Sequence, residues 1–157
     1  MSDRAFMTYN IANQIADADG ITAGKVFEKE VSLTSTQVRA MSTAPIELVA
    51  APGPGKIIEF VSAVLFLDHD GGGDYATGGN IVVRSSSAAQ VTVSGTLTSA
   101  ASINLAHDNY AMIEALNAAV MLAAEVDEAL ELYASADHIT GTSPARIKVT
   151  YRILDFS

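Results

Sequence analysis

The chain of 157 residues contains no cysteine and no tryptophan. Without cysteine it can form no disulfide, no thiolate metal site and no thiol nucleophile. Aromatic residues make up only 6% of the chain, so the core has to be built from small and β-branched side chains. Such a core suits a thin β-sandwich, and the shortage of rings argues against sugar binding. The length fits one domain with a core of its own.

Positive charge is also scarce. Nine Lys and Arg stand against eighteen Asp and Glu, a formal net charge of -9. This charge would repel phosphate backbones and anionic lipids, so we expect no direct nucleic-acid partner. The sequence also lacks an apolar run of membrane-spanning length and an apolar N-terminal signal segment. A soluble protein without a membrane partner is therefore predicted.

A strict alternation marks the segment from Ala145 to Ile153. Its apolar side chains alternate with Arg146, Lys148, Thr150 and Arg152. This period of two predicts a strand with one core face and one cationic face. We interpret Arg146, Lys148 and Arg152 as residues that contact another subunit or a nearby acidic surface.

Acidic residues accumulate in the segment before this strand. Between Ser85 and Ala145 there is no Lys or Arg. The acidic residues in it are Asp108, Glu114, Glu125, Asp127, Glu128, Glu131 and Asp137. Two alternatives stay open: the cationic strand neutralises this segment within one subunit, or it pairs with the same segment of a neighbour and fixes the docking geometry.

Further strands are predicted around turn residues. In PIELVAAPGPGKIIEFVSAVLFLD, two β-rich runs flank the PGPG turn, and the second run, Ile57 to Leu67, is apolar on both faces. That pattern predicts a central strand, or one with a face against another subunit. Shorter strands are predicted at Ile81 to Arg84 and at Gln90 to Leu97. A third alternating stretch, around Leu130 to Ala134, should return to the final strand like a hairpin through the loop ASADHITGTSP.

Loops and helices complete the predicted fold. The stretch HDGGGDYATGGN is rich in glycine and predicts an exposed, mobile loop. One helical turn is expected at Thr34 to Met41. A short helix is expected at Asn109 to Ala124, because Ala, Met, Leu and Glu favour helices. The predicted fold is mostly β: an antiparallel, jelly-roll-like β-sandwich over residues 27–157, with an extended N-terminal arm over residues 1–26 and one or two short helices.

Three aspartates form the clearest pattern with metal-binding character. Asp68, Asp70 and Asp74 surround three glycines and resemble a calcium loop, since hard cations prefer several carboxylate oxygens on a flexible turn. The order of an EF-hand and its closing glutamate are missing, so an ordinary Gly/Asp turn explains the pattern better. We expect no metal and no cofactor, with these aspartates as weak candidates.

Signatures of catalysis are absent. His69, His107 and His138 lie far apart and lack zinc-ligand spacing, which predicts three loop histidines. No serine sits in a nucleophile elbow, and the glycine-rich loop lacks the ending of a phosphate-binding loop. A calcium-dependent hydrolase would need one of the three aspartates beside a nucleophile, which nothing in the spacing indicates. We therefore expect no enzyme and no small-molecule substrate.

The apolar share of 49% together with a positive mean hydropathy favours association. A closed homo-oligomer would bury the excess apolar surface.

Four motifs together resemble a known family. They are VSLTSTQVRAM, PIELVAAPGPGKIIEFVSAVLFLD, TGGNIVVR and IKVTYRIL, which span about Val31 to Leu154. In these motifs the chain resembles the head decoration, or cement, proteins of tailed phages, which have a jelly-roll-like β-sandwich. The helix-like segment Asn109 to Ala124 departs from the pattern of that family.

The resemblance implies a bacteriophage virion structural protein that acts as a homotrimer. Such a protein binds the major capsid protein, clamps neighbouring capsid subunits and uses its arm for additional reach. It would lie on the outer capsid surface after assembly in the host cytoplasm. The alternative is a β-sandwich binding module associated with a tail or fibre.

Overall fold

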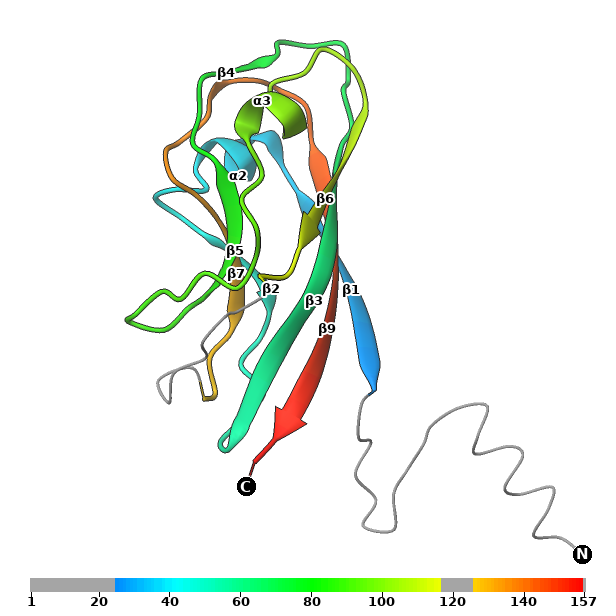
Figure 1. The fold of residues 1–157 in the computed structure, drawn as a ribbon. Coiled ribbons are helices and arrows are strands. Elements are labelled where there is room, and N and C mark those ends of the chain that lie inside the picture. The colour runs from blue at the N-terminus through cyan, green and yellow to red at the C-terminus, as the bar shows by residue number, and fades with distance from the viewer. Residues whose placement is uncertain (1–24, 117–125, 157) are drawn as a thin grey trace, which may run out of the picture.

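The computed structural model describes residues 25–116 and 126–156. Most of the secondary structure in these residues is β (Figure 1). The larger sheet has four antiparallel strands in the order β1 (Val26–Leu33), β9 (Ala145–Asp155), β3 (Lys56–Leu67) and β6 (Asn109–Glu114). The predicted mostly β, antiparallel fold is confirmed.

A smaller sheet lies opposite the larger one. Its three antiparallel strands follow the order β2 (Ile46–Val49), β7 (Leu130–Ala134) and β5 (Ile81–Ser85). A two-stranded ribbon, β4 (Tyr75–Ala76) with β8 (Ile139–Thr140), and the short helices α2 (Ser35–Arg39) and α3 (Ser99–Ser102) lie at one end (Figure 1). The two sheets and two short helices agree with a β-sandwich.

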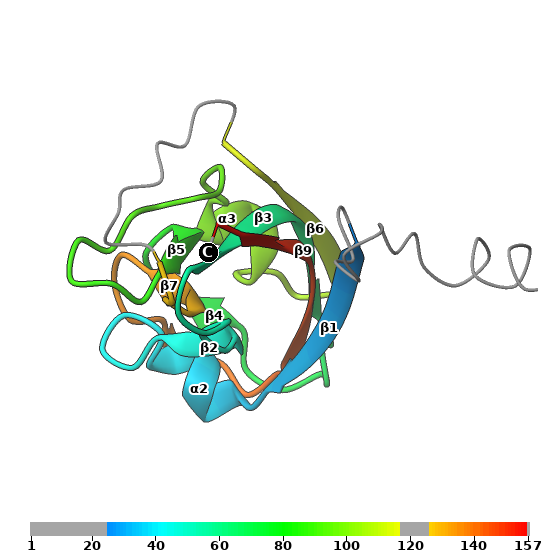
Figure 2. The same ribbon diagram turned by 90° about the horizontal axis from the view of Figure 1, so that it is seen from below.

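One core fills the space between the sheets. Leu65 and Ile147 point into it from the larger sheet, and Leu48 and Leu132 point into it from the smaller one; all four are 0–1% exposed. Seen along its axis, the molecule curves around this core (Figure 2). Each fully buried aliphatic side chain contributes about 1.5–3 kcal/mol relative to exposure, so these residues hold the sheets together.

The two strand predictions with the strongest patterns are confirmed. β9 contains the predicted strand, with Ile147 and Val149 fully buried and Arg146 and Lys148 exposed. β3 lies centrally, between β9 and β6. A bulge near Val61 shifts the register between Phe60 and Ser62 and keeps the buried side chains of both halves of β3 on the core side.

The predicted helical turn near Thr34 is also confirmed. Thr34 caps α2: its hydroxyl accepts a hydrogen bond from the Gln37 backbone N–H, and the Gln37 side chain accepts one from the Thr34 backbone N–H. This reciprocal arrangement satisfies two donors that a helix start leaves unpaired. Val38 then anchors the turn in the core.

The short helix predicted at Asn109 to Ala124 is wrong for its first half, which is strand β6. Pairing with β3 buries Ala111 and Ile113, and burial on a sheet outweighs the helix preference of Ala and Met. The rest of that prediction, residues 117–125, lies outside the described residues.

The predicted hairpin between Leu130 to Ala134 and the final strand is also wrong. β7 pairs with β2 and β5, whereas β9 pairs with β1 and β3, so the chain crosses from one sheet to the other. The connection is long enough to form β8 on the way, and β8 pairs with β4. Alternation alone could not distinguish two strands of one sheet from strands of two facing sheets.

Two smaller predictions need correction as well. The segment Gln90 to Leu97 makes only isolated bridges, at Thr92, Ser94 and Leu97, and forms no regular strand. The glycine-rich loop is largely exposed, as predicted, but Tyr75 within it is 3% exposed and belongs to β4.

The predicted arm, residues 1–26, lies outside the described residues except for Lys25 and Val26, where β1 begins. The jelly-roll connectivity remains a prediction. In the part of the chain that the structure covers, no helix has the length and apolarity needed to cross a membrane.

Candidate functional site

The register of the four-stranded sheet arranges its outward side chains in rows that cross all four strands. We call eight of these residues the outer face. The first row is Ser32, Arg146, Phe66 and Tyr110, and the second is Glu30, Lys148, Val64 and Met112. Charged side chains therefore lie on β1 and β9, and apolar side chains lie beside them on β3 and β6.

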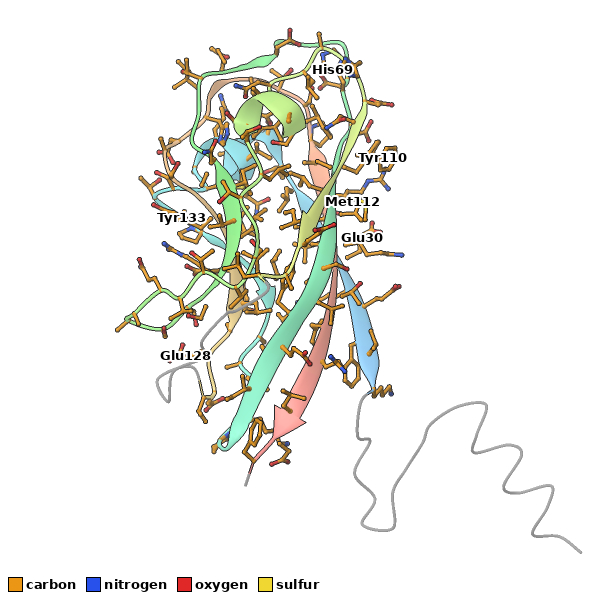
Figure 3. All side chains as sticks on the ribbon, in the orientation of Figure 1. Glu30, His69, Tyr110, Met112, Glu128 and Tyr133 are labelled. Atoms are coloured by element: carbon orange, nitrogen blue, oxygen red, sulfur yellow. The ribbon has the colours of Figure 1, made fainter. Side chains whose placement is uncertain are left out.

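The apolar part of the outer face is unusually exposed. Tyr110 is 72% exposed and Met112 is 70% exposed, and both project from the same side of the sheet (Figure 3). The Tyr110 ring lies 4.5 Å from the ring of Phe66, centroid to centroid. Adjacent exposed apolar side chains on a rigid sheet are typical of a protein-binding surface.

The cations beside this patch are only loosely held. The Arg146 guanidinium lies 4.9 Å from the centre of the Phe66 ring and 4.0 Å from an oxygen of Asp68. The Lys148 ammonium lies 3.7 Å from a carboxylate oxygen of Glu28. All four side chains of these two long pairs are about half exposed, and ion pairs of this kind add little stability. Both cations can therefore exchange partners.

Arg152, the third predicted contact residue, is bound differently. Its Nε and Nη2 atoms each lie 2.7 Å from a different oxygen of Glu59. The Nη2 contact is a hydrogen bond, and both distances are shorter than those of the Arg146 and Lys148 pairs. The structure thus separates Arg152 from Arg146 and Lys148. None of the three ion pairs involves the acidic segment 108–137.

A shallow groove joins the two halves of the outer face. Its volume is about 310 Å³. The lining residues are Glu30, Val64, Phe66, Tyr110, Arg146 and Lys148. It therefore offers charged and apolar walls to the same occupant, and its size fits a few side chains.

The three aspartates of the glycine-rich loop have separate partners. Asp70 accepts hydrogen bonds from the Gly72 backbone and from the Ser143 hydroxyl, and these contacts lower the pKa of its carboxyl group. Asp74 lies 2.9 Å from His69, while Asp68 faces Arg146. No group of acidic or histidine side chains in the described residues could hold a metal ion, so the loop geometry gives calcium no support.

The histidines lie outside the strands, as predicted, but their environments differ. His107 is exposed, whereas His138 is 1% exposed and has the Tyr75 ring edge-on at 6.4 Å. Burial lowers the pKa of His138, so its imidazole is neutral near pH 7. The Tyr75 hydroxyl donates to the Ser143 carbonyl, and burial raises the pKa of Tyr75 to about 12. The hydrogen bond of Tyr75 ties β4 to the loop that precedes β9.

The sequence interpretation missed the apolar residues of the outer face. Tyr110, Met112 and Glu114 alternate with Ala111 and Ile113, a short period-two signal inside a stretch that was interpreted as helix. That alternation could have identified the strand and its two exposed apolar side chains.

No protein-family model matches the chain, and no curated protein matches it significantly. Two solved structures are similar in shape. The first is described as the capsid asymmetric unit of cyanophage Pam1: the identity is 19%, the TM-score is 0.46, and the match covers 89% of this chain and 94% of that one. The second is described as the capsid of Ralstonia phage GP4, with 17% identity, a TM-score of 0.45, and coverage of 82% and 84%. At these values neither likeness carries a function to this chain.

Proposed function

We propose that the chain is a structural protein of a tailed-phage virion, a capsid decoration protein that binds and stabilises neighbouring capsid subunits. The observation that carries this function is the outer face, where exposed Tyr110 and Met112 adjoin the loosely paired cations Arg146 and Lys148. The four sequence motifs that resemble decoration proteins agree with it. No catalytic residue is assigned.

The surface fits binding of a protein better than catalysis. Interfaces combine apolar and aromatic side chains with arginine, and a few such residues carry most of the binding energy. Tyr110, Phe66 and Arg146 are adjacent in one row and supply these residue types. Because β3 and β9 lie in the middle of the larger sheet, the backbone positions of Phe66 and Arg146 are fixed before binding.

The proposed partner is the major capsid protein on the outer surface of the virion. A homotrimer would present three outer faces to a lattice of repeated sites, and simultaneous engagement would multiply a modest affinity. Residues 1–26 would serve as an arm that extends the contact.

Binding to undecorated heads of the phage that encodes the chain tests this function. The wild-type protein should co-sediment with them and raise their resistance to heat. The double variant Tyr110→Ser/Met112→Ser should bind at least about tenfold more weakly, because the loss of a single interface hot spot costs about 2 kcal/mol or more. Phe156→Ser is the matched control, since Phe156 is also 72% exposed but lies outside the outer face.

Failure of the wild-type protein to bind heads would contradict the decoration role. Binding to isolated tails or fibres instead would support the alternative, a tail- or fibre-associated module.

A further inference from the structure

The outer face has a charge pattern that selects its occupant. Each row passes from β1, through a cation on β9, to an apolar side chain on β3 and another on β6. Neighbouring strands lie about 4.8 Å apart, so a cation and an apolar wall are within reach of two adjacent side chains of a partner. The groove is lined by both the charged and the apolar side chains of the outer face.

The two cations differ in what surrounds them. Opposite Arg146, β1 contributes the neutral Ser32, whereas opposite Lys148 it contributes Glu30. A partner carboxylate near Lys148 would therefore meet the negative charge of Glu30, and Glu28 already lies 3.7 Å from the lysine. Arg146 pairs with Asp68, whose carboxylate oxygen lies 4.0 Å away and whose side chain is half exposed. Arg146 is thus the better place for an incoming carboxylate.

Arg146 also lies next to the apolar part of the outer face. Its guanidinium lies 4.9 Å from the centre of the Phe66 ring, and the tilted rings of Phe66 and Tyr110 have their centroids 4.5 Å apart. A guanidinium can donate two parallel hydrogen bonds to a carboxylate, a geometry that the point charge of a lysine does not offer. The same rings present an apolar surface to the residue beside that carboxylate.

We propose that the groove of the outer face takes a short segment of the partner in which an Asp or Glu stands next to a large apolar side chain. The carboxylate pairs with Arg146, and the apolar side chain lies on Phe66, Tyr110 and Met112. With the capsid subunit as that partner, the inference rests on the proposed function; the chemistry of the segment follows from the groove alone.

Two probes test the groove and the function separately. The first is the set of undecorated heads, with three variants that each remove one positive charge. Arg146→Gln should weaken binding about tenfold or more, and Lys148→Gln only about twofold to threefold. Arg39→Gln, an exposed position on α2, is the control and should bind as the wild type does.

The second probe is a random peptide display library selected against the intact protein. Selection should enrich Asp or Glu beside Leu, Ile, Phe or Met, and this enrichment should be lost with Arg146→Gln or Tyr110→Ser. Enrichment of basic peptides, or none at all, would overturn the inference. Such enrichment without any binding to heads would support the groove and overturn the decoration role.

Two further outcomes would overturn the inference. If heads bind the wild type and Arg146→Gln equally well, the inference is wrong while the function stands. If Tyr110→Ser dissociates an oligomer in sedimentation velocity and leaves head binding intact, the face belongs to a second copy of the chain, which overturns the inference.

Discussion

Polar side chains hold the loops at one end of the sandwich. Tyr75 donates its hydroxyl to the Ser143 carbonyl at 2.5 Å, and Asp137 accepts hydrogen bonds from the backbone of Ser42 and Thr43. Gly141 has a φ of +77°, and a Cβ at this position would clash with the Tyr75 ring. Glycine is therefore required at position 141 for two reasons: the positive φ and the close approach of the Tyr75 ring.

His138 should make stability depend on pH. Burial lowers the pKa of His138 in the folded protein below its ordinary 6.5, so the unfolded chain binds this proton more readily. The free energy of unfolding should therefore be highest above pH 6.5 and fall as the pH decreases from 6.5 toward the folded pKa. The negative charge of Asp137, the preceding residue, raises the pKa of His138, but the lowering by burial is larger.

Urea unfolding between pH 7.5 and 5 checks this dependence, with a loss of at most about 1.4 kcal/mol per pH unit from one group. His138→Gln should flatten the dependence in this range, whatever it does to stability at pH 7.5. His107→Gln, at an exposed position, is the control. An unchanged slope in His138→Gln would assign the dependence to other groups.

At the scale of elements, β6 illustrates the difference between strand and helix. In a helix, Tyr110 and Ile113 would share one face, because residues three apart are neighbours. In β6 they face opposite sides: Tyr110 is 72% exposed and Ile113 is 2% exposed.

Two substitutions in β6 test this assignment. Ile113→Ala should lower the free energy of unfolding by about 2–5 kcal/mol through the lost burial and the cavity left behind. Tyr110→Ser should change it by less than about 0.5 kcal/mol. Chemical denaturation measures both, and similar losses for the two variants would contradict the strand.

The same element shows how far sequence reasoning reaches. β9 and β3 were predictable because long, uninterrupted patterns of alternation or apolarity depend little on the rest of the fold. β6 was not predictable in this way. Its residues form a strand because they pair with β3, a contact between distant parts of the chain. Arg146 and Lys148 could be selected as contact residues from alternation, but their loose pairing and the closer pairing of Arg152 depend on which acids the neighbouring strands provide.

At the scale of the whole molecule, association is the main expectation. The chain is acidic overall yet exposes large apolar side chains on both edge strands of its larger sheet, Val26 on β1 and Tyr110 and Met112 on β6. Size-exclusion chromatography with light scattering should give three times the mass of one 16.4 kDa chain at micromolar concentration. A strictly monomeric mass would contradict the homotrimer. Each chain would then bind the capsid through one outer face, without the gain from simultaneous engagement.

The position of β9 within the larger sheet has a consequence for biosynthesis. β9 pairs on one side with β1 and on the other with β3, yet it follows both in the sequence. While the ribosome is still translating the segment before Ala145, β1 and β3 have no partner between them. Contacts between such distant segments form slowly, and unpaired strands invite aggregation in the meantime. The larger sheet can therefore close only after Ala145–Asp155 has left the ribosome, and a nascent chain stalled before that point should need chaperones to stay in solution.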